Sequence, residues 1–97
     1  MEGYFYIMTN KSNKVLYSGV SSDLKDRIKK HKSKKYTNSF SARYNADKLV
    51  YFEKFDSIVK AITREKQIKG GSRRSKLELI NGVNPEWEDL SDFLHEA

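Results

Sequence analysis

Five side chains of this sequence have the chemistry to act together: Tyr6, Tyr17, Arg27, His31 and Glu65. Phosphodiester hydrolysis needs such a set. A metal ion on a carboxylate polarises the phosphate, a guanidinium offsets the developing charge, and a group with a transferable proton activates water. Each residue alone has a plainer explanation, because a lone histidine is usually a packed side chain and paired tyrosines usually stabilise a hairpin. The combination favours a hydrolytic site.

Helical periodicity places three of these residues on apolar faces. At about 100° per residue, Arg27 and His31 lie on or beside the apolar stripe of a helix expected from about Leu24 to Lys34. Glu65 falls in the middle of the apolar face of the next helix. Four residues make up that face: Ile58, Ala61, Ile62 and Ile68.

A buried carboxylate at position 65 needs a cation, because burial of an unpaired charge raises its pKa until it is neutral. A salt bridge to Arg64, Arg27 or Arg43 is one interpretation, and a metal ion is the other. We expect Glu65 to point towards the sheet and the two tyrosines. Without metal, Arg27 is its nearest expected partner.

The tyrosines belong to two expected strands, GYFYIMTN and KVLYSGV, which a polar turn at residues 10–13 connects. If those four residues form the loop, Tyr6 pairs with Tyr17 on the same face of the hairpin, and Tyr4 pairs with Gly19. Position 19 would then be glycine because a side chain there would crowd Tyr4 or the backbone of an approaching substrate.

The remaining elements are a third strand, LVYFEKF, and two helices. The first of these helices is capped by Asp56 or Ser57 and runs to about Lys69, and the second runs from Arg73 to Ile80. A short acidic helix ends the chain. The order β-β-α-β-α-α predicts a small α/β (α+β) domain with a three-stranded, largely antiparallel sheet flanked by helices.

Charge divides the chain near residue 84. Residues 1–83 hold all nineteen Lys and Arg and eight acids, a net charge of +11, whereas residues 84–97 hold five acids and no Lys or Arg. A basic body suits a polyanionic partner, although solubility alone is the plainer explanation. We expect one domain over residues 1–97, with a catalytic core at about 3–83 and an acidic tail at 84–97.

Cysteine is absent, which excludes disulfide scaffolds and thiolate metal sites. No apolar run has the length of a membrane span, and the N-terminus starts a strand pattern in place of a signal peptide. We expect a cytoplasmic protein that uses no membrane and no small-molecule cofactor.

The motifs, taken in order, resemble the GIY-YIG nuclease superfamily, in particular its small stand-alone bacterial branch. Tyr4-Phe5-Tyr6 stands at the first motif and Tyr17-Ser18-Gly19 at the second. GVSSDLKDRIKKH has the usual glycine, leucine, arginine and histidine spacing, and LVYFEKF, AITREKQIK, KLELI and NPEWEDL extend the similarity over nearly the whole chain. Tyr-Phe replaces the first motif's Gly-Ile, and Ser18 replaces Ile or Val, but the tyrosines are kept.

The resemblance implies a role for each motif residue. Tyr6 matches the tyrosine that activates water or helps to deprotonate it, and Tyr17 matches the second tyrosine, which contacts phosphate or the water network. Arg27 matches the arginine that stabilises the pentavalent transition state. His31 matches a nearby polar position that is often catalytic.

The resemblance also implies one divalent cation, Mg²⁺ or Mn²⁺, held by Glu65. The asparagine that family members carry after the second helix is assigned to Asn84, with Asn81 as the alternative. The implied activity is that of a metal-dependent endonuclease on DNA, in repair or processing. A non-cleaving nucleic-acid-binding module of the same fold is the alternative, and an interaction domain that uses Trp87 and the acidic tail is the third reading.

The partner is expected to be nucleic acid, with DNA favoured over RNA. Phosphates would contact a basic rim near the site, with two aromatic side chains available for base stacking. The expected rim is Lys25, Lys29, Lys30, Lys32, Lys34, Lys35 and Arg43, and the aromatic residues are Phe40 and Tyr44.

Overall fold

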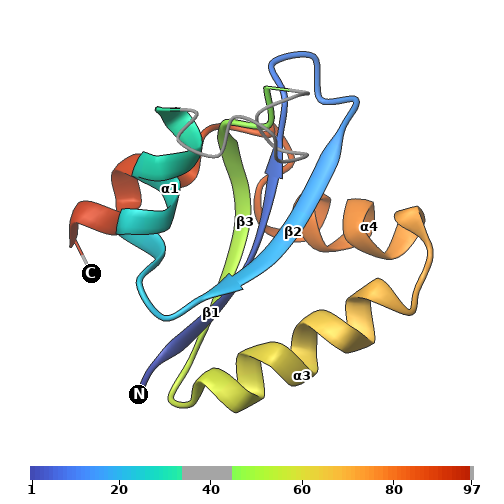
Figure 1. Ribbon diagram of the computed structural model, residues 1–97. Coiled ribbons are helices and arrows are strands. Elements are labelled where there is room, and N and C mark those ends of the chain that lie inside the picture. Colours follow the sequence, from blue (N-terminus) through green and yellow to red (C-terminus); the bar gives the residue numbers. More distant parts are fainter. Residues whose placement is uncertain (34–44, 97) are drawn as a thin grey trace.

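The computed structural model of the protein describes residues 1–33 and 45–96. Three antiparallel strands, β1 (Gly3–Thr9), β2 (Leu16–Ser21) and β3 (Lys48–Phe55), form one sheet in the order β2-β1-β3 (Figure 1). The helices of the described residues are α1 (Leu24–Lys32), α3 (Ile58–Lys69) and α4 (Arg73–Val83), followed by the 3-10 helix η1 (Leu90–Glu96). The predicted fold class and element order are confirmed.

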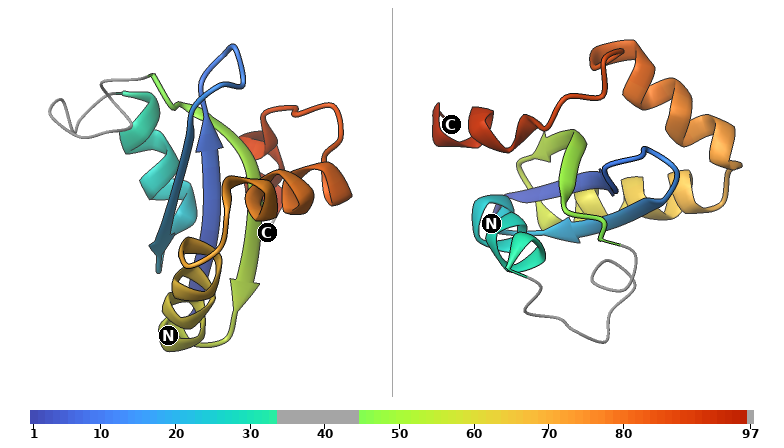
Figure 2. Two further views of the ribbon diagram at one scale, coloured as in Figure 1. Left: turned by 90° about the vertical axis from the view of Figure 1, so that its right-hand side faces the viewer. Right: turned by 90° about the horizontal axis from the view of Figure 1, so that it is seen from above.

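Side-chain alternation along β1 divides the core into two halves, one on each face of the sheet. Tyr6 and Met8 pack against Ile28 of α1 on one face. Phe5 and Ile7 pack against apolar side chains of α3 and α4 on the other. Figure 2 shows α1 and α4 on opposite sides of the sheet. Because both faces are covered, the central strand is apolar along nearly its whole length.

The predicted register of the β1–β2 hairpin is wrong by two residues. Tyr6 pairs with Gly19, and Tyr17 pairs with Met8. The loop is longer than expected because the Asn10 carboxamide oxygen accepts hydrogen bonds from the backbone N–H groups of residues 14 and 15, at 2.9 and 3.2 Å. Asn13 in the loop has a φ of 61°. A two-residue shift keeps every side chain on its predicted face.

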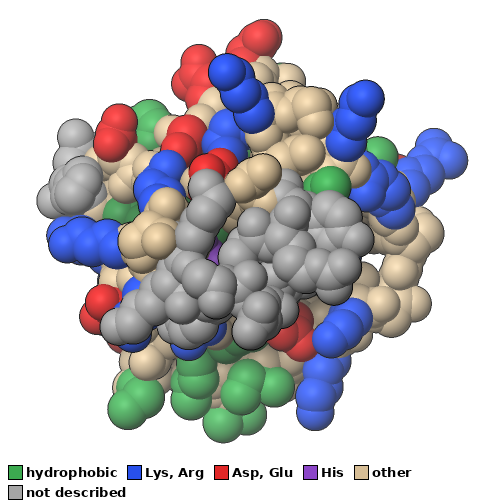
Figure 3. Space-filling model, turned by 45° about the horizontal axis from the view of Figure 1, so that its top comes forward, with side chains coloured by type: hydrophobic (Ala, Val, Ile, Leu, Met, Phe, Trp, Pro, Cys, Tyr) green, Lys and Arg blue, Asp and Glu red, His purple; other side chains and the backbone are tan. Residues whose placement is uncertain are grey.

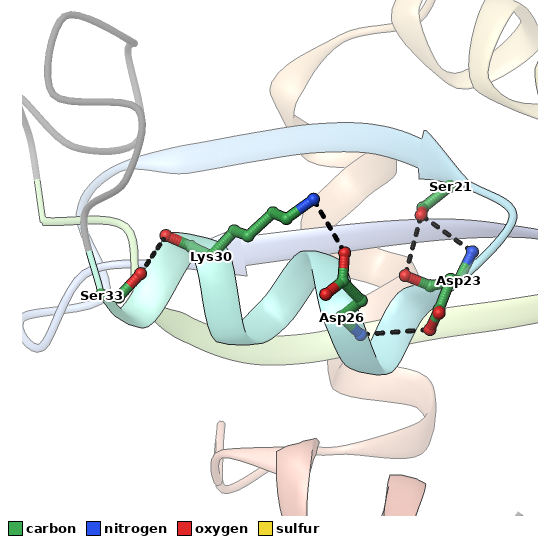
Figure 4. A network of polar contacts seen from close by, with 5 residues as sticks. All are labelled: Ser21, Asp23, Asp26, Lys30 and Ser33. Atoms are coloured by element: carbon green, nitrogen blue, oxygen red, sulfur yellow. Dashed lines mark hydrogen bonds and ion pairs between the residues drawn. The ribbon is translucent and has the colours of Figure 1, made fainter.

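A short polar turn fixes where α1 starts after β2 (Figure 4). Asp23 is the N-cap, and its carboxylate accepts a hydrogen bond from the backbone N–H of Asp26 at 3.1 Å. The hydroxyl of Ser21 accepts from the Asp23 N–H and donates to the Asp23 carbonyl, both at 3.0 Å. Asp26 also forms an ion pair with Lys30 at 2.9 Å. These contacts hold the first turn of α1 against the end of β2.

The acidic tail packs against the rest of the fold. Leu94 of η1 is buried in the same cluster as Tyr6 and Ile28. Asp89 accepts hydrogen bonds from the backbone N–H of Leu49 at 3.3 Å and from Lys32 at 2.5 Å. The tail thus joins α1 to β3. Within the described ranges, no helix is long and apolar enough to cross a membrane.

Candidate active site

Three aromatic side chains meet between the sheet and α1. The ring centres of Tyr6 and Tyr17 are 6.3 Å apart, those of Tyr6 and His31 are 5.9 Å apart, and those of Tyr17 and His31 are 5.3 Å apart. The Tyr6 hydroxyl and His31 Nε2 form a buried hydrogen bond of 3.1 Å. The prediction that the tyrosines share a face is confirmed, although they are diagonal neighbours and not a directly opposed pair.

Burial controls the protonation of this cluster. It raises the pKa of the Tyr6 hydroxyl well above its ordinary value; the neighbouring Tyr17 raises it further, and Arg27 opposes the shift through its charge and a hydrogen bond. Burial also lowers the pKa of His31, and the positive charge of Arg27 lowers it further. At neutral pH the pair therefore consists of a phenol and a neutral imidazole, with a guanidinium beside them.

Gly19 makes room for the Tyr6 hydroxyl. A Cβ atom at position 19 would lie 2.7 Å from the Tyr6 hydroxyl oxygen and 2.9 Å from its Cζ. Contacts this short force a neighbour to move, and here the neighbour is a fully buried ring. The expectation that Tyr4 would be the crowded residue is therefore wrong. The observed register places Gly19 opposite Tyr6.

Helix α3 is rotated relative to the orientation expected from its sequence. Ala61 and Ile68 are buried, whereas Ile62 is 40% exposed. On a wheel that starts at Ile58, the two buried residues lie at about 300° and 280°, so the centre of the packed face is near 290°. Glu65, at about 340°, lies at the edge of that face and is partly buried. The expectation that Glu65 lies at the centre of this face is therefore wrong.

An ion pair shows which edge of α3 is nearer to β3 and which is nearer to β2. Arg64 lies at about 240° on the same wheel, on the opposite edge from Glu65. Its Nε donates to the Glu53 carboxylate of β3 at 2.8 Å, and both side chains are less than one-third exposed. Since β3 and β2 are at opposite ends of the sheet order, Glu65 lies towards the β2 edge, on the face that α3 covers. Tyr6 and Tyr17 point to the other face of the sheet, towards α1, so the expectation that Glu65 points towards the two tyrosines is not met.

The sequence-based expectations did not include this ion pair. Glu53 lies between Tyr51 and Phe55 on the face of β3 that packs against α3. An acid at this position among apolar residues was the sequence signal for a buried ion pair. Arg64 is thus not the partner of Glu65. No ion pair of Glu65 is recorded within residues 1–33 and 45–96.

Asn84 forms three hydrogen bonds inside the fold. Its Nδ2 donates to the carbonyls of Val50, at 3.1 Å, and Glu88, at 2.9 Å, and its Oδ1 accepts from the Glu88 N–H at 3.0 Å. The side chain is buried against β3, at the other edge of the sheet from Tyr17. The alternative, Asn81, is exposed and accepts a 2.7 Å hydrogen bond from Trp87 Nε1. The structure places neither asparagine beside the tyrosine cluster.

The predicted basic rim is divided between two sides of α1. Lys30 is paired with Asp26. The other three described lysines line a cavity between α1 and η1 together with two acids of the tail, and Lys32 is paired with one of them, Asp89. These lysines are Lys25, Lys29 and Lys32, and the second acid is Asp92. Lys34, Lys35, Phe40, Arg43 and Tyr44 lie outside the described residues.

Comparison with known proteins identifies the family of this site. Residues 2–78 match the GIY-YIG catalytic domain. The chain belongs to the GIY-YIG family. Tyr6, Tyr17 and His31, which meet between the sheet and α1, all lie within the matched range.

Relatives of this GIY-YIG chain are small proteins of similar extent. A UPF0213 protein of Syntrophus aciditrophicus is 39% identical over 88% of this chain and 95% of its own length. UPF0213 protein SSP2268 of Staphylococcus saprophyticus is 39% identical over 80% of this chain and 93% of its own. The predicted small stand-alone branch is confirmed.

A solved structure supports the same assignment. The solution NMR structure of UPF0213 protein BH0048 from Bacillus halodurans is 29% identical in sequence, with a TM-score of 0.58. The match covers 92% of this chain and 93% of that one. A GIY-YIG domain is in general the catalytic domain of an endonuclease, with a nucleic acid as its substrate and a divalent metal ion as its cofactor.

The residues of this GIY-YIG chain fit a weakly held divalent ion. Glu65 is a partly buried carboxylate at the β2 side of the sheet, and no ion pair within the described ranges occupies it. The described residues contain no group of three or more His, Cys, Asp or Glu side chains placed to hold a metal together. An ion bound here would take one carboxylate and several waters, which is a coordination that Mg²⁺ commonly accepts.

Proposed function

We propose that the protein is a divalent-metal-dependent endonuclease that hydrolyses phosphodiester bonds of DNA, in DNA repair or processing. The observation that supports it most is the buried hydrogen bond between Tyr6 and neutral His31, with Arg27 beside it. A binding module has no need for a buried phenol–imidazole pair of this kind. Location in the cytoplasm stays a prediction from the sequence.

Tyr6 and His31 are proposed to move the proton of the attacking water. The raised pKa of Tyr6 makes a free phenolate costly at neutral pH. Tyr6 therefore passes its own proton to His31 Nε2 as it takes one from water, so that no phenolate forms. The lowered pKa of His31 keeps its imidazole neutral and able to accept that proton. This step requires the tautomer in which Nε2 carries no hydrogen.

The remaining roles follow from position. Arg27 interacts with the Tyr6 hydroxyl, so its guanidinium is placed to offset negative charge on a phosphate at the same point. Tyr17 borders both Tyr6 and His31 and is proposed to contact the phosphate or the water. Glu65 is proposed to hold Mg²⁺ or Mn²⁺, and the bound ion would polarise the phosphate.

The test is cleavage of supercoiled, branched and single-stranded DNA in the presence of Mg²⁺ or Mn²⁺. We expect wild-type protein to cut at least one substrate and Glu65→Gln to cut none, because the substitution keeps the shape of the side chain but removes its charge. Glu86→Gln is the matched control, since Glu86 is exposed and lies in the tail. Cutting by Glu65→Gln at the wild-type rate would contradict the metal assignment.

Metal binding is measured separately by NMR. Titration with Mg²⁺ should move the resonances of residues around Glu65 and the start of β2 in wild-type protein, but not in Glu65→Gln. Wild-type protein that binds DNA but cuts no substrate with either metal would instead support the non-cleaving module.

A further inference from the structure

A second basic surface lies at the start of β2, away from α1. It combines the β1–β2 loop with the end of α3 and the first turns of α4. The surface consists of Lys14, Lys66, Lys69, Arg73, Arg74 and Lys76. Arg73 joins its parts, because its Nη2 donates a 2.7 Å hydrogen bond to the backbone carbonyl of Lys14. Figure 3 is turned so that the end of the β1–β2 hairpin comes forward, and Lys and Arg side chains lie along the right-hand side of this view.

This second basic surface is barely neutralised. Among the described residues, its one recorded ion pair joins Arg74 to Glu78, and both of those side chains are at least 70% exposed. No Asp or Glu occurs in residues 10–15 or 66–76. The lysines of α1 differ, because Lys30 and Lys32 are both paired with acids. A run of positive charge with few nearby acids therefore lies beside β2.

The second basic surface continues from the proposed active site along two elements. Lys14 precedes Tyr17 by three residues, which corresponds to about 10 Å along an extended chain. Lys69 follows Glu65 by one helical turn, about 6 Å, on the same edge of α3. That edge faces β2, because Arg64 on the opposite edge is paired with Glu53 of β3. A DNA strand that passes the site along the β2 edge of the sheet would thus run onto this surface.

We propose that the second basic surface binds the phosphate backbone of DNA on one side of the cleavage point. The proposal deepens the proposed function and rests on it, because it says where the substrate of that site continues. Successive nucleotides of one strand rise about 3.4 Å along B-DNA, so the 10 Å from Tyr17 to Lys14 corresponds to about three nucleotides. Contacts of this kind hold and orient the DNA without reading its sequence.

The test is a triple variant, Lys14→Gln, Lys69→Gln and Lys76→Gln, with one lysine taken from each part of the surface. Arg73 is retained so that its hydrogen bond to the loop survives. The matched control is Lys48→Gln, Lys54→Gln and Lys60→Gln, which removes the same charge from the β3 side. Both are made in the Glu65→Gln protein, and binding of a fluorescent DNA duplex is followed by anisotropy from low to high salt without metal.

We expect the triple variant to lose about 0.9 units of log–log salt slope for each phosphate contact removed, and the control to keep the parent slope. With Glu65 restored, the triple variant should also cut DNA with a raised KM. Duplexes shortened to fewer than three base pairs on one side of the cleavage point should bind parent and triple variant alike.

Equal salt slopes for the triple variant and its control would overturn the proposal and leave the endonuclease intact, provided that wild-type protein cuts. Polyglutamate that binds as tightly as DNA at the same salt would also overturn it, because the surface would then suit an acidic protein. If wild-type protein neither binds nor cuts DNA, both the proposed function and this inference fail.

Discussion

The hydroxyl oxygen of Tyr6 lies 3.1 Å from Nε2 of His31, although 25 residues separate the two in the chain. Tyr6 is fully buried and His31 is 4% exposed. A strand residue and a helix residue are thus joined by a hydrogen bond in a buried site. Such a pair can transfer a proton without releasing it to solvent.

Removal of the Tyr6 hydroxyl tests this pair. We expect Tyr6→Phe to lower the cleavage rate by about 10²–10⁴-fold, the usual contribution of a proton-transfer group. The free energy of unfolding should fall by about 1 kcal/mol, since one buried hydrogen bond is lost. Tyr4→Phe is the control, because Tyr4 lies in the same strand and is only partly buried. Equal activity of the two variants would contradict the role of Tyr6.

The lowered pKa of His31 predicts a loss of stability in acid. The unfolded chain protonates this residue near its ordinary pKa of 6.5, whereas the folded chain does so only at lower pH. The unfolded state therefore binds more protons between these two values, and stability falls as the pH drops through about 6.5. Urea unfolding at pH 7.5 and 5.5 should show a larger loss for wild type than for His31→Gln. An equal loss in the two proteins would show that protonation of His31 does not destabilise the fold.

Gly19 and Gly82 provide a matched pair of substitutions. We expect Gly19→Ala to destabilise the protein and reduce cleavage, because the added Cβ would lie 2.7 Å from the Tyr6 hydroxyl oxygen. Gly82→Ala should raise the free energy of unfolding by about 0.5–1 kcal/mol, since Gly82 lies within α4 with no atom within 4 Å of the added group. Thermal unfolding and cleavage assays distinguish the two. Normal cleavage by Gly19→Ala would show that Tyr6 can move freely.

The Arg64–Glu53 pair is expected to set the rotation of α3. Its hydrogen bond raises the pKa of Arg64, and burial with the neighbouring Glu53 raises the pKa of Tyr51 to about 12. Arg64→Met should lower the free energy of unfolding by about 1 kcal/mol and weaken Mg²⁺ binding at Glu65. The exchanged pair, Arg64→Glu with Glu53→Arg, should recover both. Unchanged Mg²⁺ affinity in Arg64→Met would show that Glu65 is oriented independently.

Asn84 is predicted to act on stability. Its three hydrogen bonds, each worth about 1 kcal/mol, lead us to expect that Asn84→Ala lowers the free energy of unfolding by about 2–3 kcal/mol. Asn81→Ala should cost less, because Asn81 is exposed. Denaturant unfolding and cleavage per folded molecule are the measurements. A stable Asn84→Ala protein that fails to cut would restore a catalytic role for this residue.

Much of this site was accessible from the sequence. The alternation of the strands and the apolar stripe of the first helix were enough to place Tyr6, Tyr17 and His31 on one surface, because local periodicity determines which face a side chain takes. The same reasoning survived an error of two residues in the register, since a shift by an even number preserves the face.

What the tertiary structure decided depends on contacts between distant residues. The rotation of α3 was misjudged because Ile62 and Ile68 are equally apolar, and only the position of Glu53 on β3 selects which edge of the helix faces which strand. The register followed from hydrogen bonds of the Asn10 side chain. The lysines of α1 lie beside the acids of the tail because Leu94 is buried beneath that helix. Packing of this kind links residues that no local period relates.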